Sequence, residues 1–409
     1  MKRRALVLGG GFDQIGALVY LKQRQFQTTI VDFTAEPVAK AFADQHICKS
    51  ALSISDVMDA AIESEASVII STCIDQALPI AAAAAEALDI AFYIDSKLAS
   101  ELTNKHHLKR FMSASGVKTA PFALAETKQN ICEALSLLRL PIVIKPTDSN
   151  SSKGVFRCDR SGDVLEKFEA SLSSSRAREV VLEEFIEGDE LSIDAWVSEG
   201  GVVTILSITI LIKENSDSDN FPISYSIYSP QLLDKFESEA RDLSEKIASA
   251  AKLRDSPLLI QCIANEDGLN VLEFSPRLGG GCKVQLINAI RNTSIMQSMV
   301  DAIIDGKSRL ELDKRSDAHF AMIYIYTAPC TFGAFSLNKT IPGVCEVYIL
   351  KTKGTEIRSS GTSSDRVAAV MIKGKSAQEL LATAQEVITQ SRVTTPDGDF
   401  VEVKTSPPD

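Results

Sequence analysis

A carboxylate, an arginine and a run of glycines stand together in one short segment of this chain. Glu273 lies in an apolar run, Arg277 follows four residues later, and Gly279, Gly280 and Gly281 come next. A carboxylate at a strand end can hold a divalent metal, and an arginine beside it can neutralise phosphate oxygens. Glycines let backbone N–H groups come close to an anionic ligand. The segment therefore predicts a site for a phosphate-bearing ligand.

Two upstream segments suit the same kind of ligand. Lys145 follows the apolar run 142–144 and precedes Pro146, so its base is fixed while its ammonium stays free to bind phosphate. The loop 149–154 contains serines and a glycine, which supply hydroxyls and accessible N–H groups. An isolated lysine of this kind is more often a surface residue. The loop directly after it favours the ligand-binding interpretation.

Taken in chain order, the strand-borne lysine, the flexible loop, an acidic cluster at 180–190 and the carboxylate of Glu273 resemble the ATP-grasp ligases. The resemblance covers nearly the whole chain. It implies a fold class of α/β and α+β: an ATP-grasp fold with an N-terminal Rossmann-like parallel-sheet domain, a small β-rich lid subdomain and a C-terminal α+β domain. We expect the first at 1–104, the second with a linker helix at 105–190, and the large subdomain with its C-terminal extension at 191–409.

The resemblance also implies ATP and Mg²⁺ as cofactors, and it assigns residues to the nucleotide. Phosphate contacts fall to Lys105, Lys145, Ser151, Ser152 and Gly154; adenine contacts to Glu183, Glu184, Phe185 and Ile186; and the ribose hydroxyls to Glu190. At the adenine, either Glu183 or Glu184 would accept from the exocyclic amine, and the backbone of the next two residues would join the pairing. For Lys105 the alternative, a solvated charge on a helix, stays open.

The metal site departs from the family pattern. The usual arrangement is an acid, a second acid about a dozen residues later, and an asparagine two residues beyond it. Here Gln261, Glu273 and Ser275 occupy these positions, so one negative charge is lost. Magnesium prefers carboxylate oxygen. Weaker or fewer metal ions follow from this change, and a loss of catalysis stays open as the stronger interpretation.

The resemblance places Arg277 on the terminal phosphate and on the acyl phosphate formed from it, and it places the N–H groups around Gly280 opposite the acceptor. In such enzymes ATP activates a carboxylate and an amine then attacks it, so positioning and charge neutralisation matter most. Stand-alone L-amino-acid ligases are the most similar type. The expected function is therefore a carbon–nitrogen ligase that acts on a small-molecule carboxylate and amine, such as an amino acid or a similar small metabolite.

Three alternatives remain open. The substitutions at Gln261 and Ser275 also fit a non-catalytic ATP-binding regulator, and carboxylases that activate bicarbonate share the same scaffold. A nicotinamide oxidoreductase is suggested by the glycine-rich first turn and Asp32. That turn reads Gly9-x-Gly11-x-x-x-x-Gly16, which lacks the dinucleotide fingerprint.

Composition narrows the class further. The 409 residues carry a net charge of −11 with no basic stripe, which argues against nucleic acid or an anionic membrane as partner. No apolar run approaches the ~20 residues of a membrane span. The eight cysteines are scattered without a Cys-x-x-Cys pair, which suits free thiols and predicts a cytoplasmic protein. Nothing in the sequence decides whether it forms a homodimer.

Hydrophobic patterning predicts the elements that must position these residues. Strands are expected at 3–8, 28–31, 67–70, 91–94, 142–145, 154–157, 180–184, 258–264, 269–274, 320–326, 344–350 and 367–373. Helices are expected at 13–25, 77–88, 104–116, 162–173, 231–252 and 376–391. A hairpin spans 190–212, and a polar loop follows it. The segment 213–228, with Phe221, Ile223, Tyr225 and Tyr228, either meets a substrate or packs on its own domain.

Overall fold

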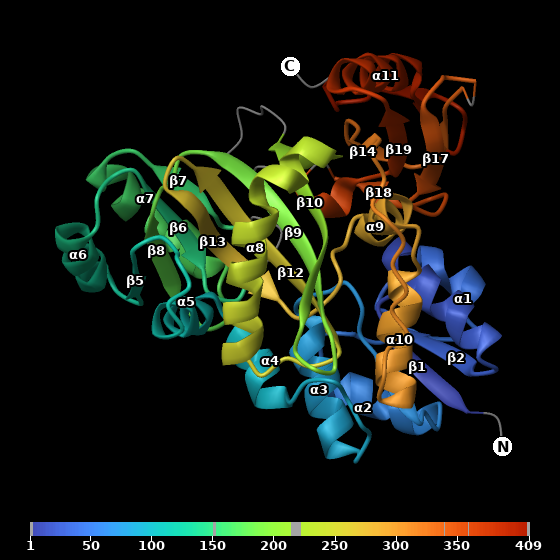
Figure 1. Cartoon of the computed structure of the whole chain (residues 1–409), viewed down its shortest axis with the longest axis horizontal. Coiled ribbons are helices and arrows are strands. Elements are labelled where there is room, and N and C mark those ends of the chain that lie inside the picture. Colours follow the sequence, from blue (N-terminus) through green and yellow to red (C-terminus); the bar gives the residue numbers. More distant parts are fainter. Residues whose placement is uncertain (1–2, 150–152, 214–221, 339, 359, 407–409) are drawn as a thin grey trace.

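The computed structural model describes residues 3–149, 153–213, 222–338, 340–358 and 360–406 (Figure 1). The chain begins with a four-stranded parallel sheet in the order β3-β2-β1-β4. Its strands are β1 (Arg4–Leu8), β2 (Gln27–Val31), β3 (Gln45–Ile47) and β4 (Val68–Ile70). The helices of this part are α1 (Ile15–Gln23), α2 (Ile54–Glu63) and α3 (Ala77–Ala87). Parallel strands buried on both faces read as continuous apolar runs, as β1 does.

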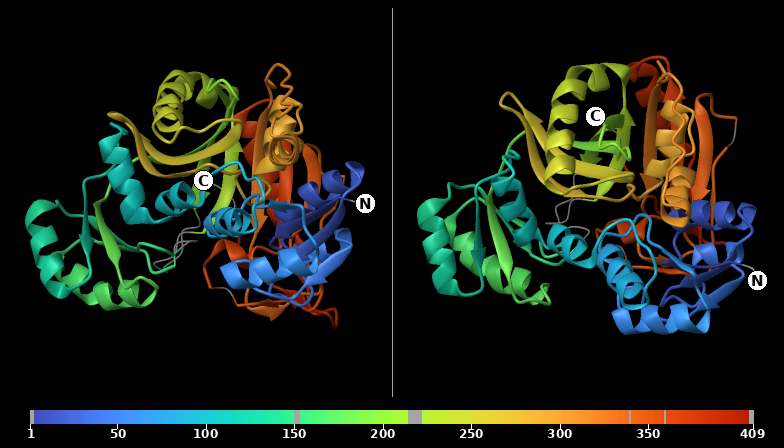
Figure 2. Two further views of the ribbon diagram at one scale, coloured as in Figure 1. Left: turned by 90° about the horizontal axis from the view of Figure 1, so that it is seen from below. Right: turned by 60° about the horizontal axis from the view of Figure 1, so that its bottom comes forward.

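A four-stranded antiparallel sheet follows, in the order β5-β8-β6-β7. Two helices, α4 (Ser96–Thr103) and α5 (Lys105–Ala114), lead into it. The sheet contains β5 (Phe122–Ala125), β6 (Ile142–Pro146), β7 (Phe156–Cys158) and β8 (Val180–Glu184), and it packs against α6 (Lys128–Leu137) and α7 (Ser161–Ser173). Both views of Figure 2 show this small sheet and its two helices standing at one end of the molecule.

The largest sheet has eight strands in the order β13-β12-β9-β10-β11-β14-β19-β17, all antiparallel. These are β9 (Asp189–Val197), β10 (Val203–Lys213), β11 (Ile223–Tyr228), β12 (Ser256–Asn265), β13 (Gly268–Ser275), β14 (His319–Ile325), β17 (Val344–Ile349) and β19 (Ala368–Gly374). Helix α8 (Pro230–Ala250) lies on it and buries residues three or four apart, such as Leu233, Phe236, Ala240 and Leu243.

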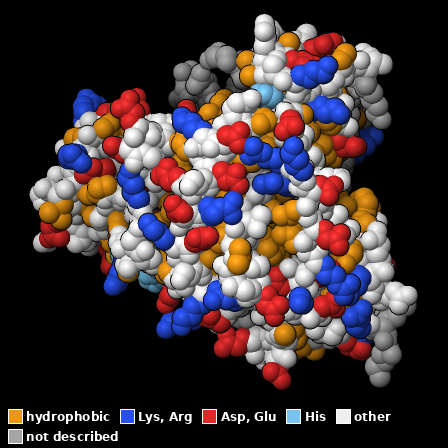
Figure 3. All heavy atoms as spheres, viewed as in Figure 1, with side chains coloured by type: hydrophobic (Ala, Val, Ile, Leu, Met, Phe, Trp, Pro, Cys, Tyr) orange, Lys and Arg blue, Asp and Glu red, His pale blue; other side chains and the backbone are white. Residues whose placement is uncertain are grey.

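Shorter elements complete the chain. These are α9 (Lys283–Arg291), α10 (Ile295–Asp305), α11 (Ala377–Gln390), β15 (Cys330–Thr331), β16 (Ala334–Ser336), β18 (Glu356–Ile357), β20 (Arg392–Thr394), β21 (Phe400–Val401) and the 3₁₀ turns η1 (Phe12–Gln14), η2 (Val38–Phe42) and η3 (Ser363–Asp365). In the described part of the chain no helix is both long and apolar enough to cross a bilayer. Acidic and basic side chains are interspersed over the face shown in Figure 3.

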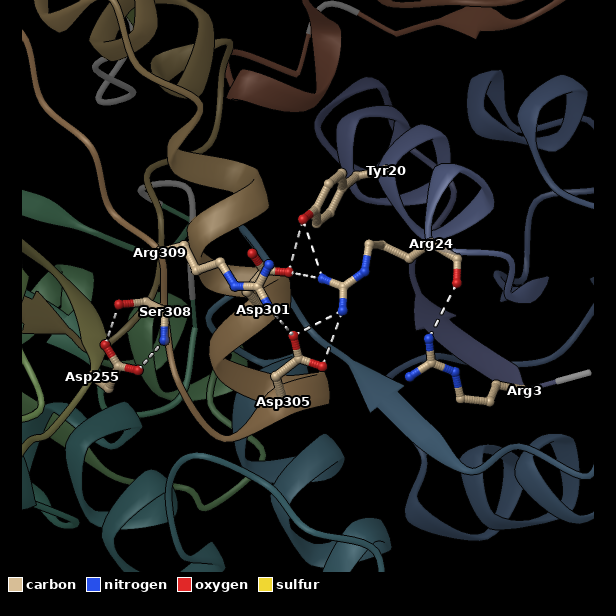
Figure 4. A network of polar contacts seen from close by, with 8 residues as sticks. All are labelled: Arg3, Tyr20, Arg24, Asp255, Asp301, Asp305, Ser308 and Arg309. Atoms are coloured by element: carbon tan, nitrogen blue, oxygen red, sulfur yellow. Dashed lines mark hydrogen bonds and ion pairs between the residues drawn. The ribbon is translucent and has the colours of Figure 1, made fainter.

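Helix α10 joins the N-terminal sheet to the rest of the molecule. Apolar side chains of α1 and α10 share one core, in which Leu18 and Leu21 accompany Met299 and Val300. A polar network continues the contact, because the guanidinium of Arg24 binds the carboxylates of two α10 residues (Figure 4). We call this network, made of Tyr20, Arg24, Asp301 and Asp305, the α1–α10 cluster.

Most predicted elements form within two residues of their expected ends, and two predictions need correction. The expected strand 91–94 is irregular instead, since the hydroxyl of Tyr93 donates to the carbonyl of Pro276 at 2.9 Å and Ile94 enters the core beneath the large sheet. The expected loop 213–228 contains β11, whose Tyr225 and Tyr228 are buried. Those two tyrosines pack inside their own domain. Phe221 and residues 214–220 lie outside the described residues.

Candidate nucleotide and ligase site

A cavity of about 930 Å³ lies between the small sheet, the large sheet and the N-terminal loops. Lys145, Glu183 and Ile186 line one end, and the other end is lined by Gly281 and Arg366. A smaller hollow beside it is lined by Asp75, Lys105, Gln261, Glu273, Ser275 and Arg277 among others. Elements from four parts of the chain, far apart in sequence, thus contribute to one continuous space.

Two lysines, the buried Lys109 and the half-buried Lys145, hold the carboxylate of Glu183. Its Oε2 lies 2.8 Å from Nζ of Lys109 and 3.1 Å from Nζ of Lys145. These two ammonium groups outweigh the burial of the carboxyl, and its pKa falls to about 2. The ammonium of Lys109 also donates to the hydroxyl of Thr119 at 2.6 Å. Glu183 therefore orients Lys145 toward the cavity, which differs from the expected role as an acceptor from adenine.

Lys105 begins helix α5 and faces the loop that follows β6. Its backbone N–H donates to the carbonyl of Thr147 at 2.8 Å, and its ammonium donates to the carbonyl of Ser149. The side chain of Asn104 caps the helix by accepting from the N–H groups of His106 and His107. Lys105 is thus fixed at the same end of the cavity as Lys145.

The loop after β6 is only partly described. Ser151 and Ser152 lie outside the described residues. Gly154 has φ +72°, and a Cβ at this position would lie 2.7 Å from Cβ of Ser174 and 2.9 Å from Cγ of Pro146. It therefore lies against α7 and β6, while the neighbouring Ser149 and Val155 line the cavity. A side chain at this position would meet these residues, and the contact of the Gly154 N–H group with phosphate stays a prediction.

Glu184, in the acidic cluster at 180–190, also has a partner within the protein. The carboxylate of Glu184 accepts from the backbone N–H of Arg139 at 2.9 Å and from its guanidinium at 3.2 Å. The N–H of Phe185 donates to the carbonyl of Pro141 at 2.8 Å. Within the described residues, the N–H of Ile186 donates to no backbone carbonyl. The Ile186 edge is thus the part of the expected adenine pairing that remains open.

Glu190 lies in β9 where this strand enters the cavity. Its carboxylate forms an ion pair with the ammonium of Lys213, and both residues line the cavity. Lys213 ends β10, so the pair joins two adjacent strands at the cavity wall. The position suits the expected contact with ribose hydroxyls.

The hairpin of β12 and β13 brings the expected metal ligands together. Gln261 and Glu273 are opposite each other in the strand register, and Ser275 lies two residues beyond Glu273. The side chain of Ser275 lies beside the carboxylate of Asp75 in the smaller hollow. Magnesium usually binds proteins through one or two carboxylates and takes its other ligands from phosphates and water. The carboxylate of Glu273 and the side-chain carbonyl of Gln261 fit this mode of magnesium binding. Across the described residues no group of three or more His, Cys, Asp or Glu side chains forms a protein-only metal cage.

Arg277 is held by a carboxylate that sequence reasoning missed. Its Nε donates to Oδ1 of Asp75 at 2.6 Å, a second guanidinium nitrogen binds Oδ2, and a third donates to the carbonyl of Leu278. The guanidinium lowers the pKa of Asp75 although burial opposes this. Asp75 follows β4, at the edge of the parallel sheet where such folds bind ligands. Its place in the chain was the signal that could have revealed it.

The glycine loop, residues 279–281, is bound by a second acidic residue of the N-terminal part of the chain. Asp13 accepts from the N–H of Gly281 at 2.8 Å and from the N–H of Cys282 at 2.9 Å. A Cβ on Gly280 would lie 3.4 Å from Oδ2 of Asp13 and 3.4 Å from the carbonyl oxygen of Cys73. Gly280 thus lies close to the N-terminal turn, where a Cβ would be in ordinary van der Waals contact.

Arg366, from the C-terminal part of the chain, lies at the same end of the cavity as the glycine loop. The hydroxyl of Tyr324 donates to the carbonyl of Gly281 at 2.7 Å, and the guanidinium of Arg366 stacks on the Tyr324 ring at 3.7 Å. Nε of Arg366 donates to the hydroxyl of Tyr326 at 2.8 Å. Arg366 and Tyr324 both line the cavity, and the sequence had suggested no role for either.

Comparisons with known proteins match two family models. An ATP-grasp domain matches residues 138–285, and an L-amino acid ligase C-terminal domain 2 matches residues 336–395. The phosphoribosylamine–glycine ligase of Lactococcus lactis is 25% identical over 302 residues, which cover 70% of this chain and 72% of that protein. For two curated relatives, the matched segments span 63% and 72% of the relatives' own length.

Solved structures share the fold over almost the whole chain. The L-amino acid ligase of Bacillus licheniformis superposes with a TM-score of 0.73 at 18% identity, covering 97% of this chain and 99% of that one. The biotin carboxylase domain of the 2-oxoglutarate carboxylase of Hydrogenobacter thermophilus gives a TM-score of 0.81 at 16% identity, covering 99% and 92%. At such identities the likeness concerns the fold.

Proposed function

Because the chain belongs to the ATP-grasp superfamily, with an ATP-grasp domain and an L-amino acid ligase C-terminal domain, we propose that it is an ATP-dependent carboxylate–amine ligase. It would form an amide bond through an acyl phosphate. The observation that carries this proposal is the single cavity that runs from Lys145 to the glycine loop. A nucleotide, a carboxylate and an amine can meet there without leaving the protein.

The nucleotide occupies the end near the small sheet. Lys105 and Lys145 bind its phosphates, and Glu183 keeps the second lysine pointed at them. Adenine pairs with the backbone at Ile186, and the ribose hydroxyls bind Glu190. We assign the expected units in the same way: residues 105–190 line this end, residues 1–104 meet the glycine loop through Asp13, and residues 191–409 carry the metal and acyl sites.

Magnesium belongs at the hairpin of β12 and β13. Glu273 and Gln261 would hold it, and Ser275 would keep Asp75 in place beside it. The bound ion supplies positive charge to the phosphate oxygens. The protein contributes one firm carboxylate here, so we expect the nucleotide phosphates to supply most of the remaining ligands.

The chemistry follows from charge neutralisation and positioning. A carboxylate oxygen of the first substrate attacks the terminal phosphorus of ATP, and ADP leaves. Arg277 neutralises the oxygens of the transferred phosphoryl group, exchanging part of its contact with Asp75 for them. The amine then attacks the acyl carbon beside Gly280, and phosphate departs. Water must be kept out of this end because it would hydrolyse the acyl phosphate.

An amino acid is the substrate class that we propose for at least one of the two substrates. Support comes from the L-amino acid ligase C-terminal domain 2 at residues 336–395, which includes Arg366 and Lys351 on the cavity wall. A weakly catalytic ATP-binding regulator remains the second candidate, because Gln261 and Ser275 replace the usual acid and asparagine.

Nucleotide binding with and without Mg²⁺ tests the proposal. We expect calorimetry to show Mg²⁺-dependent ATP binding that weakens about tenfold or more, roughly 1.4 kcal/mol, in Glu273→Ala. Glu266→Ala removes an exposed acid from the turn of the same hairpin and serves as the matched control. Binding that ignores both Mg²⁺ and Glu273 would favour the regulator. A wild type without ATP affinity would reject the proposal.

A further inference from the structure

Asp13 is the acid that meets the glycine loop from the N-terminal side. It lies in η1, between β1 and α1, and its two carboxylate oxygens accept separately from the N–H groups of Gly281 and Cys282. The turn is anchored because Gln14 donates to the hydroxyl of Thr72 at 3.2 Å. Asp13 also lines the cavity, so a bound molecule can lie beside it.

The neighbouring acidic residues at this end of the cavity are assigned to other contacts. Asp75 forms a bidentate pair with Arg277, and Glu273 lies on the proposed metal site. Among the described residues that line the cavity there is no histidine. Asp13 is therefore the carboxylate best placed beside Gly280 to act on a proton.

The surroundings of Asp13 tune its basicity in opposite directions. Burial raises its pKa, while the two N–H groups and the guanidiniums of Arg366 and Arg277 oppose the rise. The thiols of Cys73 and Cys282 and the hydroxyl of Tyr324 lie nearby, and burial raises the pKa of all three, so they remain neutral. The net direction is upward, which makes Asp13 a better proton acceptor than an exposed aspartate.

The amine substrate needs such an acceptor. An ammonium group has no free electron pair, so it cannot attack a carbonyl carbon until one proton leaves. Transfer of that proton to the carboxylate frees the pair, and the nitrogen forms the C–N bond while the bond from carbon to the phosphate oxygen breaks. The second N–H proton goes to the departing phosphate. Amide and hydrogen phosphate are the products, and the carboxylic acid returns its proton to water.

We propose that Asp13 receives the ammonium group of the amine substrate at the glycine-loop end of the cavity and takes the proton that must leave before attack. The inference rests on the ligase function proposed above. It assigns the N-terminal turn a direct part in the second half-reaction, and it makes a primary or secondary amine that is protonated at neutral pH the class of nucleophile.

Two nucleophiles separate this role from a structural one. Hydroxylamine is largely neutral at neutral pH and traps an acyl phosphate as hydroxamate without first losing a proton. The standard L-amino acids serve as the carboxylate panel and also as the protonated amines. In Asp13→Asn we expect amide formation to fall on the order of 10²-fold, with hydroxamate formation within about threefold of wild type. The amide defect should shrink as the pH rises toward the pKa of the amine.

Asp95→Asn is the matched control, because Asp95 also accepts from a backbone N–H, that of Leu98 at 2.8 Å, but is exposed on α4. We expect it to leave both reactions unchanged. Equal losses with both nucleophiles in Asp13→Asn, or no loss with either, would overturn the role of Asp13 while leaving the ligase function standing. A wild type that neither forms hydroxamate nor binds any panel member by calorimetry would overturn both.

Discussion

Two arginine–carboxylate contacts join the N-terminal part of the chain to the rest of the molecule. In the α1–α10 cluster, Arg24 reaches from α1 to Asp301 and Asp305 on α10. At the cavity, Asp75 reaches from the loop after β4 to Arg277. Arg277 is buried and Arg24 is half-buried, with side chains 9% and 22% exposed, so neither pair is a fully exposed surface contact.

The two places differ in what else their groups can touch. The side chain of Asp301 is only 4% exposed, and Tyr20 adds a hydrogen bond of 2.8 Å to the same carboxylate. Arg277 and Asp75 line a cavity, so an anionic ligand can take over one side of the pair. Breaking a buried pair costs stability in either place. Only at the cavity can a ligand offset the lost interaction with a new one. This distinguishes a functional charge pair from a structural one.

Matched substitutions should separate the two places most clearly. We expect Asp75→Asn to lower the free energy of unfolding by about 3 kcal/mol, because it leaves the buried guanidinium of Arg277 without its carboxylate. Asp301→Asn should lower it less, because Arg24 keeps its pair with Asp305. Adding ADP or a non-hydrolysable ATP analogue with Mg²⁺ should raise the melting temperature of Asp75→Asn by more than that of wild type, since phosphate oxygens replace the lost carboxylate. Thermal unfolding followed by fluorescence checks this.

In Asp301→Asn the nucleotide should give the same rise in melting temperature as in wild type. A larger rise there would mean that the α1–α10 cluster communicates with the cavity, and the comparison would fail. An unchanged rise in Asp75→Asn would show that Arg277 does not meet phosphate.

Glu183 extends the comparison to the nucleotide end, where one carboxylate lies between two lysines. Its pKa of about 2 lies below its ordinary value of 4.5, so folding favours the ionised form. This stability is fully present above about pH 5 and is lost as the pH falls toward 2; it amounts to about 3 kcal/mol. Glu183→Gln should therefore be less stable than wild type at pH 7, and the difference should narrow toward pH 3.

Urea unfolding of both proteins between pH 7 and pH 3 measures that difference. A gap of constant size over this range would mean that the carboxylate of Glu183 does not stay ionised through its two lysines. At pH 7 the variant should also bind ATP more weakly, because Lys145 loses the partner that orients it.

What the sequence could predict depended on how far apart the partners stand in the chain. Gln261 and Glu273 lie opposite each other because both belong to one hairpin, in which residues twelve apart are paired. That spacing is visible in the sequence. Strong apolar periodicity likewise predicted elements such as α8 and β13 to within two residues. The order of the site segments was sufficient to predict the ATP-grasp fold.

Asp13 and Asp75 were missed because their partners are more than 200 residues away. No local pattern shows that a carboxylate after β1 will accept from Gly281, or that one after β4 will bind Arg277. A hint existed, since β1 and β4 are adjacent parallel strands and their carboxyl ends share one edge. The ion pair between Glu183 and Lys109 was missed for a similar reason, because the burial of Lys109 could not be predicted from its basic helix.

Arg309, an exposed residue beside the α1–α10 cluster, gives the smallest expected effect. Arg309 binds Asp305 at 3.3 Å, but its side chain is 70% exposed (Figure 4). Water screens this pair, so Arg309→Ala should change the free energy of unfolding by no more than about 0.5 kcal/mol. Urea unfolding beside Asp301→Asn provides the test. A loss close to that of Asp301→Asn would show that the cluster acts as one network rather than through its buried carboxylate.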